Sequence, residues 1–423
     1  MASDRSGPRV IVVGAGVIGL SCAYYLARAG ARVLVLERDR VGAGASFGNA
    51  GCVTPGHPPL NRPGRIAQAI RQMLDSTSPL YVHPSWNPGL WRWLLGFARY
   101  CTEEHVAAAM RIMAPLGKDT LALFDQLLHE ERIECDARHG GYYDVCSTEA
   151  GLQEAEHEAR IVAGHGYSVT TLDGDEMRRR EPVLGASVIG GVHFEEAITL
   201  DPALFLERLG LAAEGHDAEV REGVGVTHVD IAGPRVTGVR LVGGGREAAD
   251  AVVIATGPYS LEMAKRVGVR LPVQPGKGYH RDIPIGPNGA PRMRIACILN
   301  ETSVFCNSLD TVVRFGGTME FSGLNRVMRP ARLQQLTRAA RAYIEGIGTA
   351  RPVSEWCGLR PMSVDGLPIV GPLGGVEGLS VATGHGMLGL TFAPVTGQMI
   401  ARLVMGEPDS RLEGLSPARF ARR

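Results

Sequence analysis

The sequence predicts an α/β protein in which a Rossmann-type dinucleotide-binding domain, assembled from separated segments, carries an inserted second domain. Three observations predict this fold. A short apolar strand at residues 10–13 runs directly into a Gly-x-Gly-x-x-Gly pattern at residues 14–19. A helical pattern and a second apolar strand follow, and that strand ends in Glu37. Another apolar strand ending in Thr-Gly returns at residues 251–257, so the domain is interrupted along the chain.

Each glycine of the first pattern has a separate physical role. Gly14 permits a tight turn, Gly16 lets the backbone approach a pyrophosphate, and Gly19 lets the helix pack closely on the strand. The N-terminus of the following helix offers unpaired N–H groups to the phosphates. Glu37 is placed to accept hydrogen bonds from a ribose, and its charge disfavours the 2′-phosphate of NADP. A glycine-rich turn between buried elements is the alternative, but the complete strand–helix–strand pattern with its terminal acid favours a nucleotide site.

Size and composition narrow the possible functions. The chain has 423 residues, with 44 Lys and Arg against 44 Asp and Glu. This balance disfavours nucleic acid as a partner. The 8 cysteines have no metal-ligand spacing, so no metal site is expected. The polar N-terminus and the lack of an apolar run of about 18 residues predict a cytoplasmic protein.

The remaining pattern predicts where the second domain is inserted. Helices are expected over residues 65–131, 149–164, 330–347 and the end of 384–405, and another begins at Asp201-Pro202, where Asp is a good cap and Pro fits the first turn. Strands are expected over residues 141–145, 190–194 and 236–242, the last as a strand of the first domain resumed. Residues 271–319 alternate strands with turns, which is typical of a mixed or antiparallel sheet.

Three further segments are candidates for chemistry. The small residues of 42–51 allow backbone to lie flat against a planar ring, although a flexible linker has the same composition. Arg360 lies in Gly-Leu-Arg-Pro, and its guanidinium is suited to clamp a carboxylate; a surface arginine in a turn is the alternative. The glycines of 384–391 allow close approach to a ligand at the start of the last helix, and His385 among them is also typical of a structural hydrogen-bonding residue.

Six segments in order along the chain carry a family resemblance: residues 14–37, 46–55, 275–279, 314–320, 358–361 and 383–386. With them the chain resembles the D-amino-acid oxidase (DAO) type of FAD-dependent oxidoreductase, and within it the branch of the D-amino-acid dehydrogenase small subunit. The resemblance implies a glutathione-reductase-like FAD-binding domain formed by residues 1–60, 190–262 and 355–423. It implies an α+β substrate domain, built on a mixed or antiparallel sheet, formed by residues 61–189 and 263–354.

The resemblance also implies a set of residues at the FAD. They are Gly14, Gly16, Val17, Ile18, Gly19, Glu37, Arg38, Ser46, Asn49, Ala50, Gly51, Val224, Thr256, Gly257, Gly384, His385, Gly386, Leu388, Gly389, Leu390 and Thr391.

Three residues are implied as the candidate catalytic site. Arg360 falls on the arginine that holds the substrate carboxylate, Tyr279 on a tyrosine near the substrate pocket, and His385 beside the pyrimidine edge of the flavin. The implied reaction, in amino-acid catabolism, is oxidative deamination of a D-amino acid or a proline- or hydroxyproline-type imino acid. Hydride leaves Cα for flavin N5, and the imine then hydrolyses to a 2-oxo acid and ammonia. The alternatives are a glycine- or sarcosine-type amine oxidase that uses oxygen, an NAD-dependent dehydrogenase, and a non-catalytic FAD-binding assembly or scaffold protein.

Two cysteines depart from the family pattern. Cys52 stands where relatives of this branch often have glutamine, which changes the polarity of the pocket. Cys357 lies near the position at which the sarcosine-oxidase branch carries a flavin-linked cysteine, so it is either a covalent link or a buried free thiol.

The electron acceptor is expected to be a quinone, a carrier or oxygen. Residues 84–101 bear on this choice because they hold Trp86, Trp91 and Trp93 together with Arg92 and Arg99. Tryptophan with arginine on an amphipathic segment suits peripheral contact with the inner face of a membrane. A helix packed on the FAD-binding domain is the interpretation that we favour.

Overall fold

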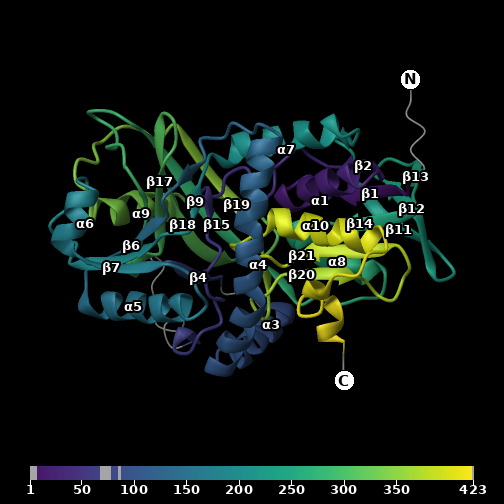
Figure 1. Cartoon of the computed structure of the whole chain (residues 1–423), viewed down its shortest axis with the longest axis horizontal. Helices are drawn as coiled ribbons and strands as arrows, with labels where there is room; N and C mark the ends of the chain where they lie inside the picture. The colour runs from purple at the N-terminus through teal and green to yellow at the C-terminus, as the bar shows by residue number, and fades with distance from the viewer. Residues whose placement is uncertain (1–6, 67–77, 84–86, 422–423) are drawn as a thin grey trace.

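The protein is described here as a computed structural model, which covers residues 7–66, 78–83 and 87–421. Within these residues the strands form four sheets, and two of them are large. Figure 1 shows the six-stranded sheet on the right and the nine-stranded sheet on the left, with helix α4 (Glu103–Glu130) running between them in this view.

The six-stranded sheet is a Rossmann sheet with the strand order β10-β2-β1-β14-β21-β20. All its neighbours pair in parallel except β20, which pairs antiparallel with β21. Its strands are β1 (Arg9–Val13), β2 (Arg32–Leu36), β10 (Glu219–Arg221), β14 (Ala251–Ile254), β20 (Ile369–Pro372) and β21 (Leu379–Thr383). The central strands are apolar on both faces because helices and loops cover both sides, as expected for a parallel sheet.

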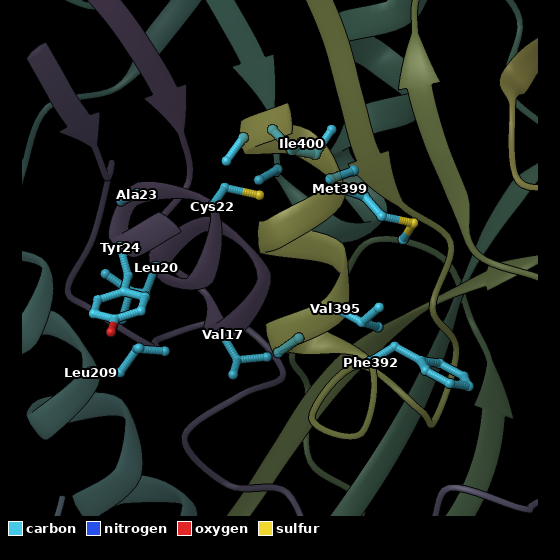
Figure 2. Packing of buried hydrophobic residues seen from close by; sticks show 14 of the residues in the cluster. Val17, Leu20, Cys22, Ala23, Tyr24, Leu209, Phe392, Val395, Met399 and Ile400 are labelled. Atoms are coloured by element: carbon cyan, nitrogen blue, oxygen red, sulfur yellow. The ribbon is translucent and has the colours of Figure 1, made fainter. Parts of the chain in front are cut away.

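One face of this sheet is covered by helix α1 (Val17–Arg28), with α7 (Pro202–Gly215) and α10 (Ala393–Val404) packed beside it. Figure 2 shows Val17, Leu20 and Cys22 of α1 among the buried side chains of α10 and α7. Gly397 allows this close packing, since a Cβ there would lie 2.5 Å from the Ser21 carbonyl oxygen. As predicted, α7 begins at Asp201, whose Oδ1 accepts hydrogen bonds from the Ala203 and Leu204 N–H groups at 2.8 and 3.2 Å.

The nine-stranded sheet is mixed, with the order β19-β15-β18-β17-β16-β6-β8-β7 and β4 added beside β18. Only the β16–β6 and β18–β4 pairs are parallel. Its strands are β4 (Leu80–Val82), β6 (Tyr142–Cys146), β7 (Val169–Asp173), β8 (Gly190–Phe194), β15 (Val273–Pro284), β16 (Ala296–Leu299), β17 (Val304–Ser308), β18 (Val312–Phe321) and β19 (Ser354–Ser363). The predicted fold class, an interrupted Rossmann-type domain with a second unit on a mixed sheet, is confirmed.

The other helices cover or join the two sheets. They are α3 (Pro88–Arg99), α5 (Glu149–Ala163), α6 (Gly174–Arg180), α8 (Ser260–Arg266) and α9 (Pro330–Arg341). Helix α4 buries Met113 and Phe124 in the core beside α1, and Val106 and Met110 in the core below the nine-stranded sheet. The small sheets consist of β3 (Cys52–Val53), β9 (Ile198–Thr199) and β5 (Arg138–His139), and of β11 (Val226–Ala232), β12 (Arg235–Leu241) and β13 (Arg246–Ala248).

Three segments pair differently from the sequence-based expectation. Residues 190–194 form β8 and residues 354–363 form β19, and both strands belong to the nine-stranded sheet. Strand β12, expected to resume the Rossmann sheet, lies in a separate antiparallel sheet. Strand pairing depends on partners far along the chain, so a local apolar pattern does not choose between sheets. The proposed division into two domains stays a prediction, and by strand pairing β8 and β19 group with the nine-stranded sheet of the substrate side.

Within the described part of the chain, no helix combines the length and the apolar character needed to cross a bilayer.

Candidate functional site

A cavity of about 570 Å³ lies between the two large sheets. Its walls come from the carboxyl ends of β1, β2 and β14, from residues 44–54, and from β15, β19 and the start of the last helical segment. The predicted site residues that line it are Gly14, Gly16, Val17, Ile18, Glu37, Arg38, Ser46, Asn49, Ala50, Thr256, Gly257, Tyr279, Arg360, His385, Gly386, Leu388, Gly389 and Leu390. Segments widely separated in sequence therefore meet in one cavity.

The glycine turn has the close contacts that the sequence predicts. Gly14 has φ +103°, and a Cβ there would lie 2.7 Å from the Ala255 carbonyl oxygen. Gly19 does not line the cavity. A Cβ at Gly19 would lie 1.8 Å from the Gly14 carbonyl oxygen, so this glycine lets α1 pack against the turn. The first N–H of α1, that of Val17, donates to Ser46 Oγ at 3.0 Å.

The acid at the end of β2 is held by backbone. Glu37 Oε2 accepts a hydrogen bond from the Ala15 N–H at 2.8 Å, and Oε1 accepts one from the Asp39 N–H at 2.9 Å. Each oxygen keeps a lone pair for a ribose hydroxyl. Beside it, the Arg38 guanidinium lies 3.9 Å from the centre of the Tyr259 ring, which gives this end of the cavity a flat cationic wall.

The opposite wall is a flat floor made by β15 and β19. Gly278 and Gly358 pair directly across these strands. A Cβ at Gly278 would lie 2.3 Å from Arg360 Cζ, and a Cβ at Gly358 would lie 2.1 Å from the Trp356 ring. The two large side chains therefore fold over two glycines, and a side chain at either glycine would displace them.

Arg360 is a cation without an acidic partner. Its Nη1 donates to the Thr318 carbonyl oxygen at 2.7 Å, and within residues 7–66, 78–83 and 87–421 no carboxylate pairs with it. Thr318 has φ +64°, a strained conformation for a β-branched residue, at a bulge between β15 and β18. Desolvation lowers the pKa of Arg360 to about 10, so the guanidinium remains charged at neutral pH. A half-buried cation that lines a cavity and has no acidic partner is suited to an anionic ligand.

His385 is buried and neutral. Its Nε2 hydrogen-bonds with Thr396 Oγ1 at 3.0 Å, and its Nδ1 has no hydrogen-bond partner among the described residues. Desolvation lowers the pKa of His385 to about 3. A buried polar atom without a partner beside a cavity indicates that a ligand completes the site.

Tyr279 lines the cavity, but its hydroxyl already has a partner within the protein. Strand alternation puts its side chain on the face of β15 opposite to Arg360. Its hydroxyl donates to Glu320 Oε2 at 2.8 Å, and Lys277 Nζ lies 3.2 Å from Glu320 Oε1. The Tyr279 hydroxyl is thus engaged in a buried network behind the floor.

Cys357 lies on that same rear face. Its Sγ–H donates to the Arg326 carbonyl oxygen at 3.3 Å, and it is not among the residues that line the cavity. This placement favours the buried free thiol over the covalent link. Cys52 does line the cavity, and burial raises the pKa of its thiol.

Four further predicted residues lie outside the cavity lining: Gly51, Val224, Gly384 and Thr391. Thr391 Oγ1 accepts a hydrogen bond from the Thr54 N–H at 3.0 Å, and Gly51 packs against the Leu200 carbonyl, so both hold neighbouring segments. The residues that sequence reasoning missed include Gly48, Tyr142, Ile298, Phe305, Trp356 and Gly358. Alternation along β6, β16 and β17 marks such residues as buried, but it does not show which face meets a cavity.

The described side chains include no group of three or more His, Cys, Asp or Glu suited to a metal ion.

These features fit a flavin dinucleotide. The glycine turn and Glu37 suit the pyrophosphate and the ribose, the cavity between the two sheets has room for a large ring, and the unpartnered Nδ1 of His385, which lines the cavity, suits a polar ligand atom. Beyond the floor stands the unpaired guanidinium of Arg360. Fold and site together define a dinucleotide-dependent oxidoreductase.

Comparison with known proteins gives the family. The chain belongs to the DAO family of FAD-dependent oxidoreductases, whose family model matches residues 9–403. It is 35% identical over 421 residues, 98% of this chain and 99% of the relative, to a D-amino acid dehydrogenase of Xanthobacter autotrophicus. Among solved structures, glycine oxidase from Geobacillus kaustophilus has a TM-score of 0.79 at 24% identity, covering 98% of this chain and 99% of that chain. L-proline dehydrogenase from P. horikoshii has a TM-score of 0.75 at 17% identity, covering 98% of each chain.

The predicted cofactor, FAD, and the prediction of an oxidoreductase are therefore confirmed. The NAD-dependent and non-catalytic alternatives have no support.

Proposed function

We propose that this protein oxidatively deaminates a D-amino acid and that Arg360 holds the substrate carboxylate. The observation that carries the proposal is the unpaired guanidinium above the glycine floor, with no carboxylate partner among the described residues. The relatives named D-amino acid dehydrogenase, at 33–35% identity over nearly the whole chain, support the substrate class.

The proposed roles of the side chains follow from their placement. Arg360 binds the carboxylate through its guanidinium, and the carbonyl of Thr318 fixes the orientation of that fork. The side chains of Tyr142, Ile298 and Phe305 line the cavity and keep water from the reacting carbon. Bound FAD supplies the chemistry, accepting the hydride from Cα of a substrate whose amine is neutral. The imine product then hydrolyses in water to a 2-oxo acid and ammonia, and a cyclic amine stops at the cyclic imine.

Anaerobic reduction of the bound flavin tests this function directly. The holoenzyme is mixed without oxygen with D-amino acids, D-hydroxyproline, glycine and sarcosine, and with L-amino acids as the matched control, while the yellow absorbance is followed. We expect bleaching by D-amino acids at rates well above those for their L-enantiomers. Bleaching by glycine or sarcosine alone would transfer the assignment to the amine-oxidase alternative. Failure of every D-amino acid to reduce a flavin that dithionite reduces would refute the proposal.

A quinone or a carrier is proposed as the electron acceptor, because the curated relatives carry the name dehydrogenase. The holoenzyme reduced by substrate is mixed with a soluble quinone or with oxygen, and flavin reoxidation is timed. Reoxidation at least ten times faster with the quinone is the expected result. Faster reoxidation by oxygen would identify an oxidase.

Peripheral membrane contact through α3 is a further part of the proposal. Trp86 lies outside the described residues. The inner face of α3 packs on the nine-stranded sheet through Leu90 and Trp93, whose Nε1 donates to the Pro272 carbonyl oxygen at 3.2 Å. Its outer face leaves Trp91 46% and Leu95 66% exposed. The helix is therefore packed on the protein and still presents an apolar outer face with arginines.

Flotation with vesicles containing anionic lipid tests this contact. Leu95→Glu should reduce the bound fraction at least threefold. The matched control is Leu211→Glu, since Leu211 is an equally ordinary exposed leucine, 50% exposed, on α7. Equal binding of the two variants would exclude α3 as the contact.

A further inference from the structure

Residues 46–51, here called the cavity loop, are held against the nine-stranded sheet by a row of three side chains. His280 of β15 donates from Nδ1 to the Gly48 carbonyl oxygen at 2.7 Å. Arg314 of β18 donates from Nη1 to the Asn49 carbonyl oxygen at 2.9 Å. Asn307 of β17 donates from Nδ2 to the Ala50 carbonyl oxygen at 3.1 Å. Three adjacent strands thus bind three consecutive carbonyl groups.

Each donor is itself fixed and buried. Arg314 forms a two-point pair with Asp282, Nε to Oδ1 at 2.9 Å and Nη2 to Oδ2 at 2.8 Å. Arg138 Nη2 donates to Asn307 Oδ1 at 3.1 Å, and the His280 ring stacks on Trp356 at 5.2 Å between centres. His280, Asp282, Asn307 and Arg314 are at most 6% exposed. A bidentate arginine–carboxylate pair of this kind fixes direction as well as position.

The Arg314–Asp282 pair lies close to the imidazole of His280. His280 Nε2 lies 3.7 Å from Asp282 Oδ2, and burial and the charge of Arg314 lower the pKa of His280 to about 4. The imidazole is therefore neutral at pH 7, with its proton on Nδ1 for the Gly48 carbonyl. Arg314 is the cation that donates directly to a carbonyl of the cavity loop, and its charge is balanced by Asp282.

The direction of the Asn49 carbonyl decides the direction of the next N–H group. In a trans peptide the C=O and the following N–H point in opposite directions. The Asn49 N–H donates to the Ser46 carbonyl at 3.4 Å and the Gly51 N–H to Asn49 Oδ1 at 2.7 Å. The Ala50 N–H lies between them, on the peptide whose carbonyl Arg314 binds, and has no partner among the described residues. Ala50 also lines the cavity.

We propose that Arg314, oriented by Asp282, is a positioning residue for the FAD. By holding the Asn49 carbonyl against the sheet, it presents the Ala50 N–H to the flavin ring that binds in the cavity. A fixed N–H donor favours the electron-rich reduced ring over the oxidised ring, because the donor is already oriented and needs no rearrangement. The pair therefore sets the affinity and the reduction potential of the flavin, without touching the substrate.

The experiment compares two substitutions at Arg314 with one at Arg281, a control arginine. Arg314→Met removes the donor to Asn49, and Arg314→Lys keeps a cation that can bind either Asp282 or the carbonyl. Arg281→Met is the control: Arg281 is the next residue on β15 after His280, lies on the opposite face, and pairs with Glu355 at 2.6 Å. For each variant the apoprotein is titrated with FAD, and the visible spectrum and the midpoint potential of the reloaded protein are recorded.

We expect Arg314→Met to weaken FAD binding about tenfold, the effect of one lost charge-assisted hydrogen bond, to lower the midpoint potential and to shift the visible bands. Arg314→Lys should recover part of each change, and Arg281→Met should match the wild type. If Arg314→Met does not fold, Asp282→Asn replaces it and should lower the potential in the same direction. Wild-type potential and spectrum in the Arg314 variants, or in Asp282→Asn where it stands in for them, would overturn the proposal, whatever their thermal stability.

Discussion

The two large sheets build opposite sides of one cavity by different means. The six-stranded sheet contributes backbone: a glycine turn, the N-terminus of α1, and Glu37 held by two N–H groups. Apart from Arg9 at the start of β1, its central strands β1 and β14 are apolar and buried. The nine-stranded sheet contributes side chains, and it buries charged residues such as Lys277, Asp282 and Arg314. One side of the cavity is thus a backbone motif encoded by neighbouring residues, while the charged groups of the other side are brought together by strand pairing.

In the nine-stranded sheet, charged side chains are paired with side chains of opposite charge, and Arg360 departs from this pattern. Lys277 is paired with Glu320 and Arg314 with Asp282, as buried ions must be. Arg360 is the exception within the described residues, since only neutral groups, the Thr318 carbonyl and the Met319 sulfur, contact its guanidinium. The contrast supports the proposal that the partner of Arg360 is a ligand.

The largest expected effect tests that exception. Arg360→Met should lower kcat/KM for a D-amino acid by a factor of about 30 to several thousand, corresponding to about 2–5 kcal/mol for a lost charged clamp. Because Arg360 has no acidic partner, its removal leaves no buried carboxylate uncompensated, and FAD binding should persist. Stopped-flow flavin reduction and FAD titration measure the two quantities. An unchanged kcat/KM would remove Arg360 from the site.

The next effect tests the backbone-built side. Gly19→Ala places a methyl group 1.8 Å from the Gly14 carbonyl oxygen, so α1 must move. We expect a loss of about 1–3 kcal/mol in the free energy of unfolding and weaker FAD binding, both followed by urea titration with and without FAD. Gly210→Ala is the control, because a Cβ on that helical glycine meets nothing within 4 Å. Equal stability of the two variants would contradict the close-packing role of Gly19.

A third effect, seen only as a dependence of stability on pH, concerns a buried acid on β6 of the side-chain-built sheet. Burial, together with the charges of Glu158 and Glu301, raises the pKa of Asp144 to about 8 against the opposing effects of Asn300 and Arg62. The folded state holds the proton more tightly than the unfolded chain does. The contribution of this carboxyl to the free energy of unfolding therefore falls as pH rises toward 8. Relative to wild type, Asp144→Asn should gain about 2–3 kcal/mol in unfolding free energy between pH 6 and pH 9. Urea titrations at both pH values measure it, and parallel pH profiles would show that Asp144 is not protonated.

The sequence predicts the structure of the two regions with unequal success, because one depends on neighbouring residues and the other on residues far apart in the chain. Residues 9–37 form β1, α1 and β2 as predicted, because the turn, the helix and the apolar strands are encoded by neighbours in sequence. Residues 190–194 and 236–242 form strands as predicted, but the second was expected to resume the Rossmann sheet and pairs elsewhere, since pairing partners are not local. Strand alternation likewise decided that Tyr279 and Arg360 lie on opposite faces.

By itself, the sequence determined the interrupted Rossmann-type fold, the glycine turn with its acid, and the family, because each of these resides in short local patterns. Tertiary structure alone decided which arginine stays unpaired, which face of β15 meets the cavity, and which strands bind the carbonyls of the cavity loop. Those choices depend on the alternation and register of strands that are far apart in the chain. A shift of one residue in register would turn the side chains of a strand to the opposite face of the sheet.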